Sequence, residues 1–319
     1  MRKPFVSVVI PAYNEEVYIK RCLDSVLKQD YGSDNYEVLV VDNNSADKTS
    51  MVIREFPGVK YLFKEKGPVG AVRNFGVEKS RGEIIAFLDS DCIAPSNWIS
   101  AGVELLGDGP GRIFGGKYLI DGRGTWVERC WLLPSKMKLQ AEKDLLGGCI
   151  FIYRSDFLSV GGFSEGITSG EDSKLSVDLK ARGCVVVIME AINVIHLGNP
   201  KTVGSFIKRQ IWHSENYIEK FRDFIFDPTF HLSSFFGICL IFFIFSIAFA
   251  SVEVVILFVF PLLMVPMVFS VKRLARSDLR RIAFFDILGI YILDFFYLFG
   301  RTLGILKGIK TTIFRNFKK

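Results

Sequence analysis

The sequence has few cysteines, and no two of them stand close together. Its six cysteines are scattered through 319 residues, without a Cys-x-x-Cys pair or a zinc-binding spacing. This distribution is typical of proteins in a reducing compartment, where disulfides are rare. The amino-terminal residues also lack the apolar stretch and small-residue cleavage site of a signal peptide. We therefore expect the amino-terminal part of the chain to stay in the cytoplasm.

The two commonest phosphate-binding loops are also missing. No GxGxxG follows the first apolar segment, and the sequence has no GxxxxGK[ST]. Their absence argues against a dinucleotide oxidoreductase and against a P-loop ATPase. The sequence has no nucleic-acid motif that combines basic and aromatic residues either, so we expect no nucleic-acid partner.

Charge is nearly absent from residues 232–271, where Glu253 is the sole charged side chain. About 20 apolar residues suffice to cross the hydrocarbon core of a bilayer. We therefore predict spanning helices at about 232–250 and 254–271, joined by a tight turn. This composition divides the chain into a catalytic domain, residues 1–225, and a membrane domain, residues 226–319.

The segment 282–300 is ambiguous, because it is long enough to span but contains Asp286 and Asp294. Basic residues cluster before it, at 272–281, and after it, at 307–319. Cationic clusters beside apolar segments remain on the cytoplasmic side and attract anionic lipids. An interfacial helix keeps both clusters inside, and we favour it over a third span. We expect a multi-pass protein of the cell (inner or plasma) membrane, with its catalytic domain facing the cytoplasm.

Short apolar segments alternate with amphipathic ones in the first 90 residues. Residues 5–10, 36–41, 59–63 and 84–88 are predicted strands. Helices are predicted between them, the first capped by Asn14. Such a βαβαβαβ order predicts an α/β fold with a Rossmann-like parallel sheet and right-handed crossovers.

Acidic residues follow two of these strands directly. Asp42 follows residue 41, and Asp89 and Asp91 follow Leu88. Ligands bind beyond the carboxyl ends of strands in such sheets, and carboxylate oxygens suit Mg²⁺ or Mn²⁺. Aspartate also favours turns, so the acidic residues at either strand end alone are weak evidence for a ligand site. Two acidic strand ends together indicate one nucleotide-sized crevice.

Four motifs in order carry a resemblance to a known family. They are Pro-Ala-Tyr-Asn-Glu-Glu at 11–16, Val-Asp-Asn-Asn-Ser-Ala-Asp at 41–47, Arg-Asn-x-Gly at 73–76 and Leu-Asp-Ser-Asp at 88–91. Together they resemble the nucleotide-sugar half of a family 2 glycosyltransferase of the GT-A fold. The resemblance extends over about two thirds of the chain and ends before the membrane segments.

The resemblance implies a role for each matched residue on the donor side. Asp42 would accept a hydrogen bond from a uracil-type base, Arg73 would meet the diphosphate, and Asp91 would ligate the metal. Asp89 would reach the ribose or the metal. The implied nucleotide-binding residues are Pro11, Ala12, Tyr13, Glu15, Asp42, Arg73, Asp89 and Ser90. Asn14, Glu15, Asp42, Asp47 and Arg73 each also have a purely structural interpretation as a cap, turn or surface residue.

On the acceptor side, the resemblance implies a Gly-Gly turn at Gly147 and Gly148 and an acidic pair at Glu171 and Asp172. Asp172 matches the catalytic base, and a carboxylate can remove the proton of a sugar hydroxyl, which is a poor nucleophile. The pair could also simply begin a helix. His196 follows a predicted strand and could complete the metal shell with Asp89 and Asp91.

Trp212 aligns with the tryptophan of the Gln-x-x-Arg-Trp segment of processive family members. Lys208 and Ile211 stand where that segment has glutamine and arginine. This departure favours transfer of a single sugar over polymer synthesis. Trp212 is assigned to the acceptor side, on an amphipathic helix expected at 206–224.

The expected function is inverting, Mn²⁺- or Mg²⁺-dependent transfer of one sugar from a nucleotide diphosphate sugar, UDP-linked by preference, to a lipid-linked or membrane-associated acceptor. The expected partners are that donor, that acceptor and membrane lipids. Two alternatives remain: a polyprenyl-phosphate glycosyl synthase, whose nucleophile is the lipid phosphate, and a catalytically inert membrane scaffold of the same fold.

Overall fold

The structure is a computed structural model, and it divides the chain into two compact units. The first unit comprises Met1–Asp121 and Lys138–Gly198, and the second comprises Gly122–Met137 and Asn199–Lys319. The expected domain boundary at residue 225 stays a prediction. The structure describes residues 3–107, 109–122, 124–134, 144–167, 169–215, 227–249 and 252–317.

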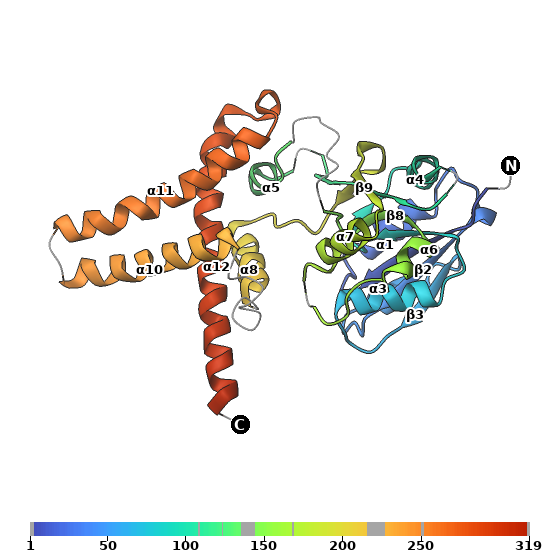
Figure 1. The fold of residues 1–319 in the computed structure, drawn as a ribbon, viewed down its shortest axis with the longest axis horizontal. Coiled ribbons are helices and arrows are strands. Elements are labelled where there is room, and N and C mark those ends of the chain that lie inside the picture. Colours follow the sequence, from blue (N-terminus) through green and yellow to red (C-terminus); the bar gives the residue numbers. More distant parts are fainter. Residues whose placement is uncertain are drawn as a thin grey trace. The chain divides into compact units, whose positions relative to one another are not determined.

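A seven-stranded sheet forms the centre of the first unit (Figure 1), in the order β3-β2-β1-β4-β8-β6-β9. The four strands expected from the sequence are parallel neighbours, which confirms the predicted α/β sheet. β8 runs antiparallel to β4 and to β6, whereas β6 and β9 are parallel. The strands are β1 (Val6–Ala12), β2 (Tyr36–Asp42), β3 (Val59–Phe63), β4 (Ile84–Leu88), β6 (Arg112–Gly115), β8 (Cys149–Tyr153) and β9 (Val185–Ile188).

Helices cover both faces of this sheet, because alternate strand residues point to opposite faces. Val8 and Ile10 of β1 pack in one apolar cluster, and Val9 packs in the other. The first cluster includes residues of α1 (Ile19–Val26), α2 (Thr49–Arg54) and α4 (Trp98–Leu106). The second includes residues of α3 (Val69–Glu78), α6 (Arg154–Ser159) and α7 (Glu171–Ala181). The first unit is therefore a three-layer α/β fold.

The prediction that Asn14 caps the first helix is wrong. Helix α1 begins at Ile19, and Tyr18 occupies its N-cap without a side-chain cap bond. Asn14 has a positive φ of 56°, and its side-chain oxygen accepts a hydrogen bond from the backbone N–H of Ala46. A short polar side chain tolerates this backbone region, so Asn14 serves a loop and not a helix end.

A second, three-stranded sheet has the order β5-β10-β7. Its strands are β5 (Cys92–Ile93), β10 (Val194–His196) and β7 (Tyr118–Leu119). β5 pairs antiparallel with β10, so that His196 lies opposite Cys92. β10 pairs parallel with β7. This small sheet brings three distant parts of the chain next to the end of β4.

Every regular element that the structure describes in the second unit is a helix. Its three longest helices are each long and apolar enough to cross a membrane, over Pro228–Ile247, Val252–Arg276 and Phe284–Thr312. The helix expected at 206–224 is helical over Val203–Ser214, and residues 216–226 lie outside the described residues. The helices are α5 (Trp126–Trp131), α8 (Val203–Ser214), α10 (Pro228–Phe249), α11 (Val252–Arg276) and α12 (Phe284–Phe317).

Both acidic residues of the ambiguous segment have cationic partners in the second unit. The Arg129 guanidinium binds the Asp286 carboxylate at 3.0 Å. The Arg273 guanidinium binds Asp294 at 2.5 Å and also donates to the backbone carbonyls of Cys130 and Trp131. A buried carboxylate is stable only when paired, so Arg273 holds α5, α11 and α12 together.

Glycine allows α12 to pack closely on α8. A Cβ atom on Gly304 would lie 2.0 Å from Ser214 Oγ and 2.4 Å from the Ile211 carbonyl oxygen. A Cβ atom on Gly300 would lie 2.7 Å from the Gln210 Cβ. A backbone oxygen cannot rotate away, so any side chain at position 304 must push the two helices apart.

We therefore predict that Gly304→Ala lowers the free energy of unfolding by about 1–3 kcal/mol, as overpacking does. Thermal unfolding of the full chain in detergent would report the change as a lower Tm. Gly204→Ala on α8 is the matched control, because its Cβ meets nothing within 4 Å. Equal Tm values for the two variants would contradict this account of the α8–α12 contact.

Candidate active site

The predicted donor-side residues gather at the carboxyl edge of the main sheet. β1, β2 and β4 are parallel, so Ala12, Asp42 and Leu88 end at the same edge. The chain order reverses between β1 and β4, because β2 and β3 lie on one side and β8 on the other. Crevices at such reversals are where ligands bind in α/β sheets.

Hydrogen bonds hold the loops after β1 and β2 together. The backbone N–H of Asn14 donates to Ser45 Oγ at 3.0 Å, and that of Glu15 donates to Thr49 Oγ1 at 2.7 Å. The Glu16 N–H donates to Asp47, whose other carboxylate oxygen accepts from the Thr49 N–H. These bonds fix the loop that follows Pro11, Ala12 and Tyr13. The Tyr13 ring remains exposed, and Lys66 contacts it.

Asp42 is buried and oriented by its neighbours. Its carboxylate accepts hydrogen bonds from the Ser45 N–H at 3.0 Å and from the Tyr61 hydroxyl at 2.9 Å. The structure therefore places Asp42 at the end of β2 with a fixed orientation. Its contact with a nucleotide base stays a prediction.

Arg73 lies between two carboxylates. Its guanidinium binds Asp89 at 2.8 Å and Glu171 at 2.7 Å, and the residue is only 3% exposed. Burial raises the pKa of Asp89, but Arg73 and the Tyr118 hydroxyl outweigh this effect and hold it below its usual range. Contact of Arg73 with a diphosphate stays a prediction, since the described partners of its guanidinium are protein carboxylates.

The Gly147–Gly148 turn fits against this network because it has no side chains. A Cβ atom on Gly147 would lie 2.7 Å from the Arg73 guanidinium. One on Gly148 would lie 2.1 Å from an Asp89 carboxylate oxygen and 2.6 Å from the Tyr118 hydroxyl. The turn precedes β8, whose residue Cys149 pairs with Leu88 of β4. The predicted acceptor-side glycines therefore lie against the predicted donor-side carboxylate.

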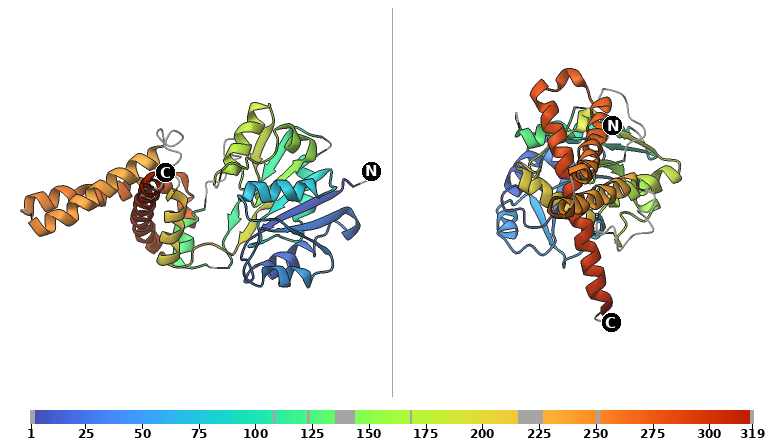
Figure 2. Two further views of the ribbon diagram at one scale, coloured as in Figure 1. Left: turned by 90° about the horizontal axis from the view of Figure 1, so that it is seen from below. Right: turned by 90° about the vertical axis from the view of Figure 1, so that its left-hand side faces the viewer.

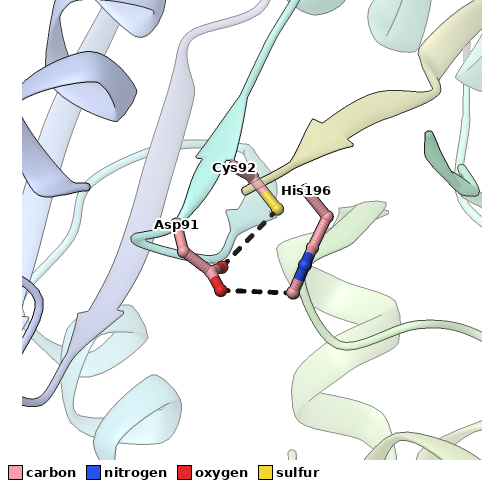
Figure 3. Close-up of side chains that lie close together, drawn as sticks. All are labelled: Asp91, Cys92 and His196. Carbon is pink, nitrogen blue, oxygen red and sulfur yellow. Dashed lines mark hydrogen bonds and ion pairs between the residues drawn. The ribbon is translucent and has the colours of Figure 1, made fainter. Parts of the chain in front are cut away.

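Asp91, Cys92 and His196 form a cluster of metal-ligand atoms (Figure 3). Their oxygen, sulfur and nitrogen atoms lie within 4.8 Å of one another, and His196 Nε2 is 3.2 Å from Asp91 Oδ2. Gly198 leaves room for the carboxylate, since a Cβ there would lie 2.0 Å from Asp91 Oδ2. Carboxylate oxygen and imidazole nitrogen suit a divalent transition-metal ion such as Mn²⁺. Two of the three predicted ligands, Asp91 and His196, are in this cluster, whereas its third member is Cys92 and not Asp89. Binding of Mn²⁺ or Mg²⁺ stays a prediction.

An excess of acidic groups around this cluster also favours a bound cation. Burial, together with the carboxylates of Asp91 and Asp89, raises the pKa of Glu15 to about 8. Burial beside Asp89 and Asp91 also raises the pKa of the Cys92 thiol well above its usual range. Several acidic groups thus share a small volume, and a bound cation would relieve their mutual repulsion.

Asp172 lies in the first turn of α7, after Gly170 in the left-handed region with a φ of 83°. Its carboxylate accepts the Gly147 N–H at 3.1 Å and the Ser173 N–H at 2.8 Å. Burial, with the charge of Glu171 beside it, raises the pKa of Asp172. A half-buried carboxylate with a raised pKa and a fixed orientation is suited to accept a proton.

The structure brings most predicted site residues together through three shared contacts. Arg73 links Asp89 to Glu171, and the glycine turn links Asp89 to Asp172. Pairing of β5 with β10 brings His196 to Asp91. Trp212 lies on α8 in the second unit with its ring exposed, and its assignment to the acceptor side stays a prediction.

The sequence motifs did not assign two residues of the site, Tyr118 and Cys92. The Tyr118 hydroxyl donates to Asp89 at 2.8 Å and accepts from the Gly148 N–H at 3.2 Å. Cys92 contributes a sulfur atom beside Asp91. Cys92 directly follows the Asp-Ser-Asp motif, which could have indicated it. Tyr118 follows a glycine-rich stretch with no motif of its own.

Comparison with known proteins assigns the family. The family model described as glycosyl transferase family 2 matches residues 7–157. The glycosyltransferase AglE of Haloferax volcanii is 32% identical over 217 residues, which are 65% of this chain and 71% of that protein. The chain belongs to glycosyltransferase family 2. It is therefore a glycosyltransferase, as the motifs predicted.

A further sequence relative and a solved structure match different shares of this family 2 glycosyltransferase. A Methanococcus voltae relative is named dolichyl N-acetyl-alpha-D-glucosaminyl phosphate 3-beta-D-2,3-diacetamido-2,3-dideoxy-beta-D-glucuronosyltransferase. It is 32% identical over 106 residues, 31% of this chain and 33% of its own length. The structure of the Pyrobaculum calidifontis mannosyltransferase PcManGT with GDP-Man and Mn²⁺ matches 96% of this chain and 88% of that chain, with a TM-score of 0.57 and 17% identity. This likeness confirms the GT-A fold.

Proposed function

We propose that this glycosyltransferase moves one sugar from a nucleotide diphosphate sugar to a lipid-linked acceptor, with inversion at the anomeric carbon. The observation that carries the proposal is the position of Asp172. Its carboxylate accepts the N–H of Gly147, and the next residue, Gly148, lies against Asp89. A candidate base and a candidate nucleotide-binding carboxylate thus lie on either side of one glycine turn.

Proton transfer and displacement occur together in the proposed reaction. Asp172 accepts the proton of the acceptor hydroxyl while the hydroxyl oxygen bonds to the anomeric carbon. The bond from that carbon to the diphosphate breaks, and its electron pair leaves with the diphosphate. Attack opposite the leaving group inverts the configuration. A divalent ion held by Asp91 and His196, with Asp89 beside them, would supply positive charge for the leaving diphosphate.

Different observations support the proposed donor and the proposed acceptor. The resemblance of the strand-end motifs favours a uridine nucleotide, and the GDP-Man of the Pyrobaculum structure makes a guanosine nucleotide the competing choice. The Methanococcus relative carries a dolichyl phosphate in its name, which supports a lipid-linked acceptor. The apolar helices of the second unit would hold the enzyme in the membrane where such a lipid resides.

A binding experiment on the purified full chain tests donor and metal together. We expect titration calorimetry to detect binding of either UDP-sugars or GDP-sugars in the presence of Mn²⁺. EDTA should abolish that binding. Electron paramagnetic resonance of free Mn²⁺ should show at least about tenfold weaker metal binding by Asp91→Asn, since the variant loses a ligand charge.

Asp121→Asn is the matched control, because Asp121 is exposed and pairs with Arg21 in the same unit. Unchanged Mn²⁺ affinity in Asp91→Asn would reject the metal assignment. Absence of binding by every nucleotide sugar, with a folded protein, would instead indicate an inert scaffold.

A further inference from the structure

Helix α12 contacts the α10–α11 hairpin only part-way along the hairpin's length. The Thr302 hydroxyl donates to the Ser233 carbonyl, and the Phe295 ring packs on Phe236 at 5.4 Å between centroids. On α11, the Tyr291 hydroxyl donates to the Leu263 carbonyl and Ser270 donates to Asp294. Residues 233–236 are near the start of α10, and residues 263–270 extend from the middle of α11 into its second half. α12 therefore packs against the end of the hairpin where its two termini lie.

The far end of the hairpin extends away from α12. Figures 1 and 2 show α10 and α11 side by side, with α12 crossing them at a steep angle. Phe245 of α10 is 60% exposed, and Ile256 and Phe260 of α11 are 61% and 65% exposed. A third spanning helix would run along the hairpin over the thickness of the bilayer. α12 instead crosses its base.

One side of α12 carries an apolar stripe with the spacing of three and four residues that places side chains on one helix face. The middle of the stripe, Phe295 and Thr302, packs on α10. The two ends of the stripe are exposed on either side of the hairpin, and we call these residues the flanking stripe. It consists of Phe285, Leu288 and Ile292 before Phe295, and of Leu306 and Ile309 after Thr302.

The opposite side of α12 is covered by protein. Gly289 lies against Cys130 of α5, and Gly300 and Gly304 lie against α8. Lys307 pairs with Glu215 at the end of α8. The hairpin and the flanking stripe are thus on one side of α12, and two short helices are on the other.

We propose that α12 lies along the membrane surface, with the flanking stripe immersed in the lipid and only α10 and α11 crossing the bilayer. The hairpin and the flanking stripe are on the same side of α12. If the hairpin crosses the membrane, α12 therefore lies at its surface with the flanking stripe facing the lipid. The 34 residues of α12 extend about 51 Å, well beyond the roughly 30 Å of a hydrocarbon core. The chain before α10 and the chain after α11 then lie on the same side.

Depth measurements on spin-labelled full chain in liposomes test this proposal. Labels at Leu288 and Leu306, each replaced by cysteine, are separated by 18 residues, about 27 Å along the helix. We expect oxygen and nickel-chelate accessibility to place both labels at nearly the same shallow depth. Labels at Ile256 and Val268, two exposed positions of α11, are the control and should differ in depth by up to about 18 Å.

Labels at 288 and 306 that lie near opposite surfaces would overturn the proposal in favour of three spans. A second readout uses protease-sensitive tags at the two ends of the chain in sealed vesicles. We expect both tags to be cleaved from the same side. Cleavage from opposite sides would likewise overturn the proposal.

Discussion

Asp172→Asn is expected to lower kcat for sugar transfer by about 10²–10⁴-fold, the range that general-base catalysis contributes. Asparagine keeps the size of the side chain and can still accept the Gly147 N–H through its oxygen, so the fold should persist. Transfer can be measured as radioactive sugar that moves from the nucleotide into the lipid extract of membranes. Asp178→Asn on the same helix is the control, because Asp178 forms an exposed ion pair with Lys174.

The pH profile gives this prediction a second readout. Asp172 accepts a proton only when it is ionised, and burial with the adjacent Glu171 raises its pKa. Turnover should therefore fall as the pH falls through a value above the ordinary aspartate pKa of about 3.9. The acidic limb should disappear in Asp172→Asn. Robust transfer by this variant would favour the polyprenyl-phosphate synthase, because a phosphate nucleophile needs no base.

Arg73→Met is expected to lower the free energy of unfolding by about 3–5 kcal/mol, the cost of leaving a buried charge without its partner. Arg73 is buried between Asp89 and Glu171, and the variant would leave both carboxylates without this cationic partner. Arg73→Lys should recover part of the loss, since one ammonium group cannot reproduce the planar fork that meets two carboxylates. Chemical denaturation of the purified protein measures the differences.

Arg81→Met is the control for this experiment. The Arg81 side chain is 74% exposed, and its nitrogen lies 3.7 Å from Glu37. A surface pair of this kind contributes about 0–1 kcal/mol. Equal destabilisation by Arg73→Met and Arg81→Met would contradict the buried network. A double variant, Arg73→Met with Glu171→Gln, should be less destabilised than the sum of its parts, because the residues interact directly.

The parts of the site that could be predicted are those fixed by strand ends. Asp42, Asp89 and Asp91 follow apolar runs whose period and length identify buried parallel strands, and such strands place their carboxyl ends at one edge. Tyr118 could not be predicted, because its contact with Asp89 depends on the two-residue strand β7. A pairing so short and so distant in sequence leaves no periodic signal.

Local sequence patterns did not indicate the tertiary partners of Asn14 and Arg73. Asn14 has the composition of a helix cap, but hydrogen bonds to Ser45 and Ala46 draw it into a loop, and the helix begins later. The motif containing Arg73 predicts a diphosphate contact, which stays a prediction, but it did not indicate the carboxylate partners Asp89 and Glu171. In both cases the sequence drew attention to the residue, but the partners of its side chain are distant in the sequence.

The course of the chain between the two units limits how the enzyme can be divided for experiments. Residues 122–137 belong to the second unit although residues on both sides of them belong to the first. A truncation after residue 198 would retain α5 but remove α12, which packs on it. The apolar side chains of Val127, Cys130 and Trp131 would then meet water. Such a fragment should aggregate, and a soluble version needs polar replacements on α5 or a short linker in place of residues 122–137.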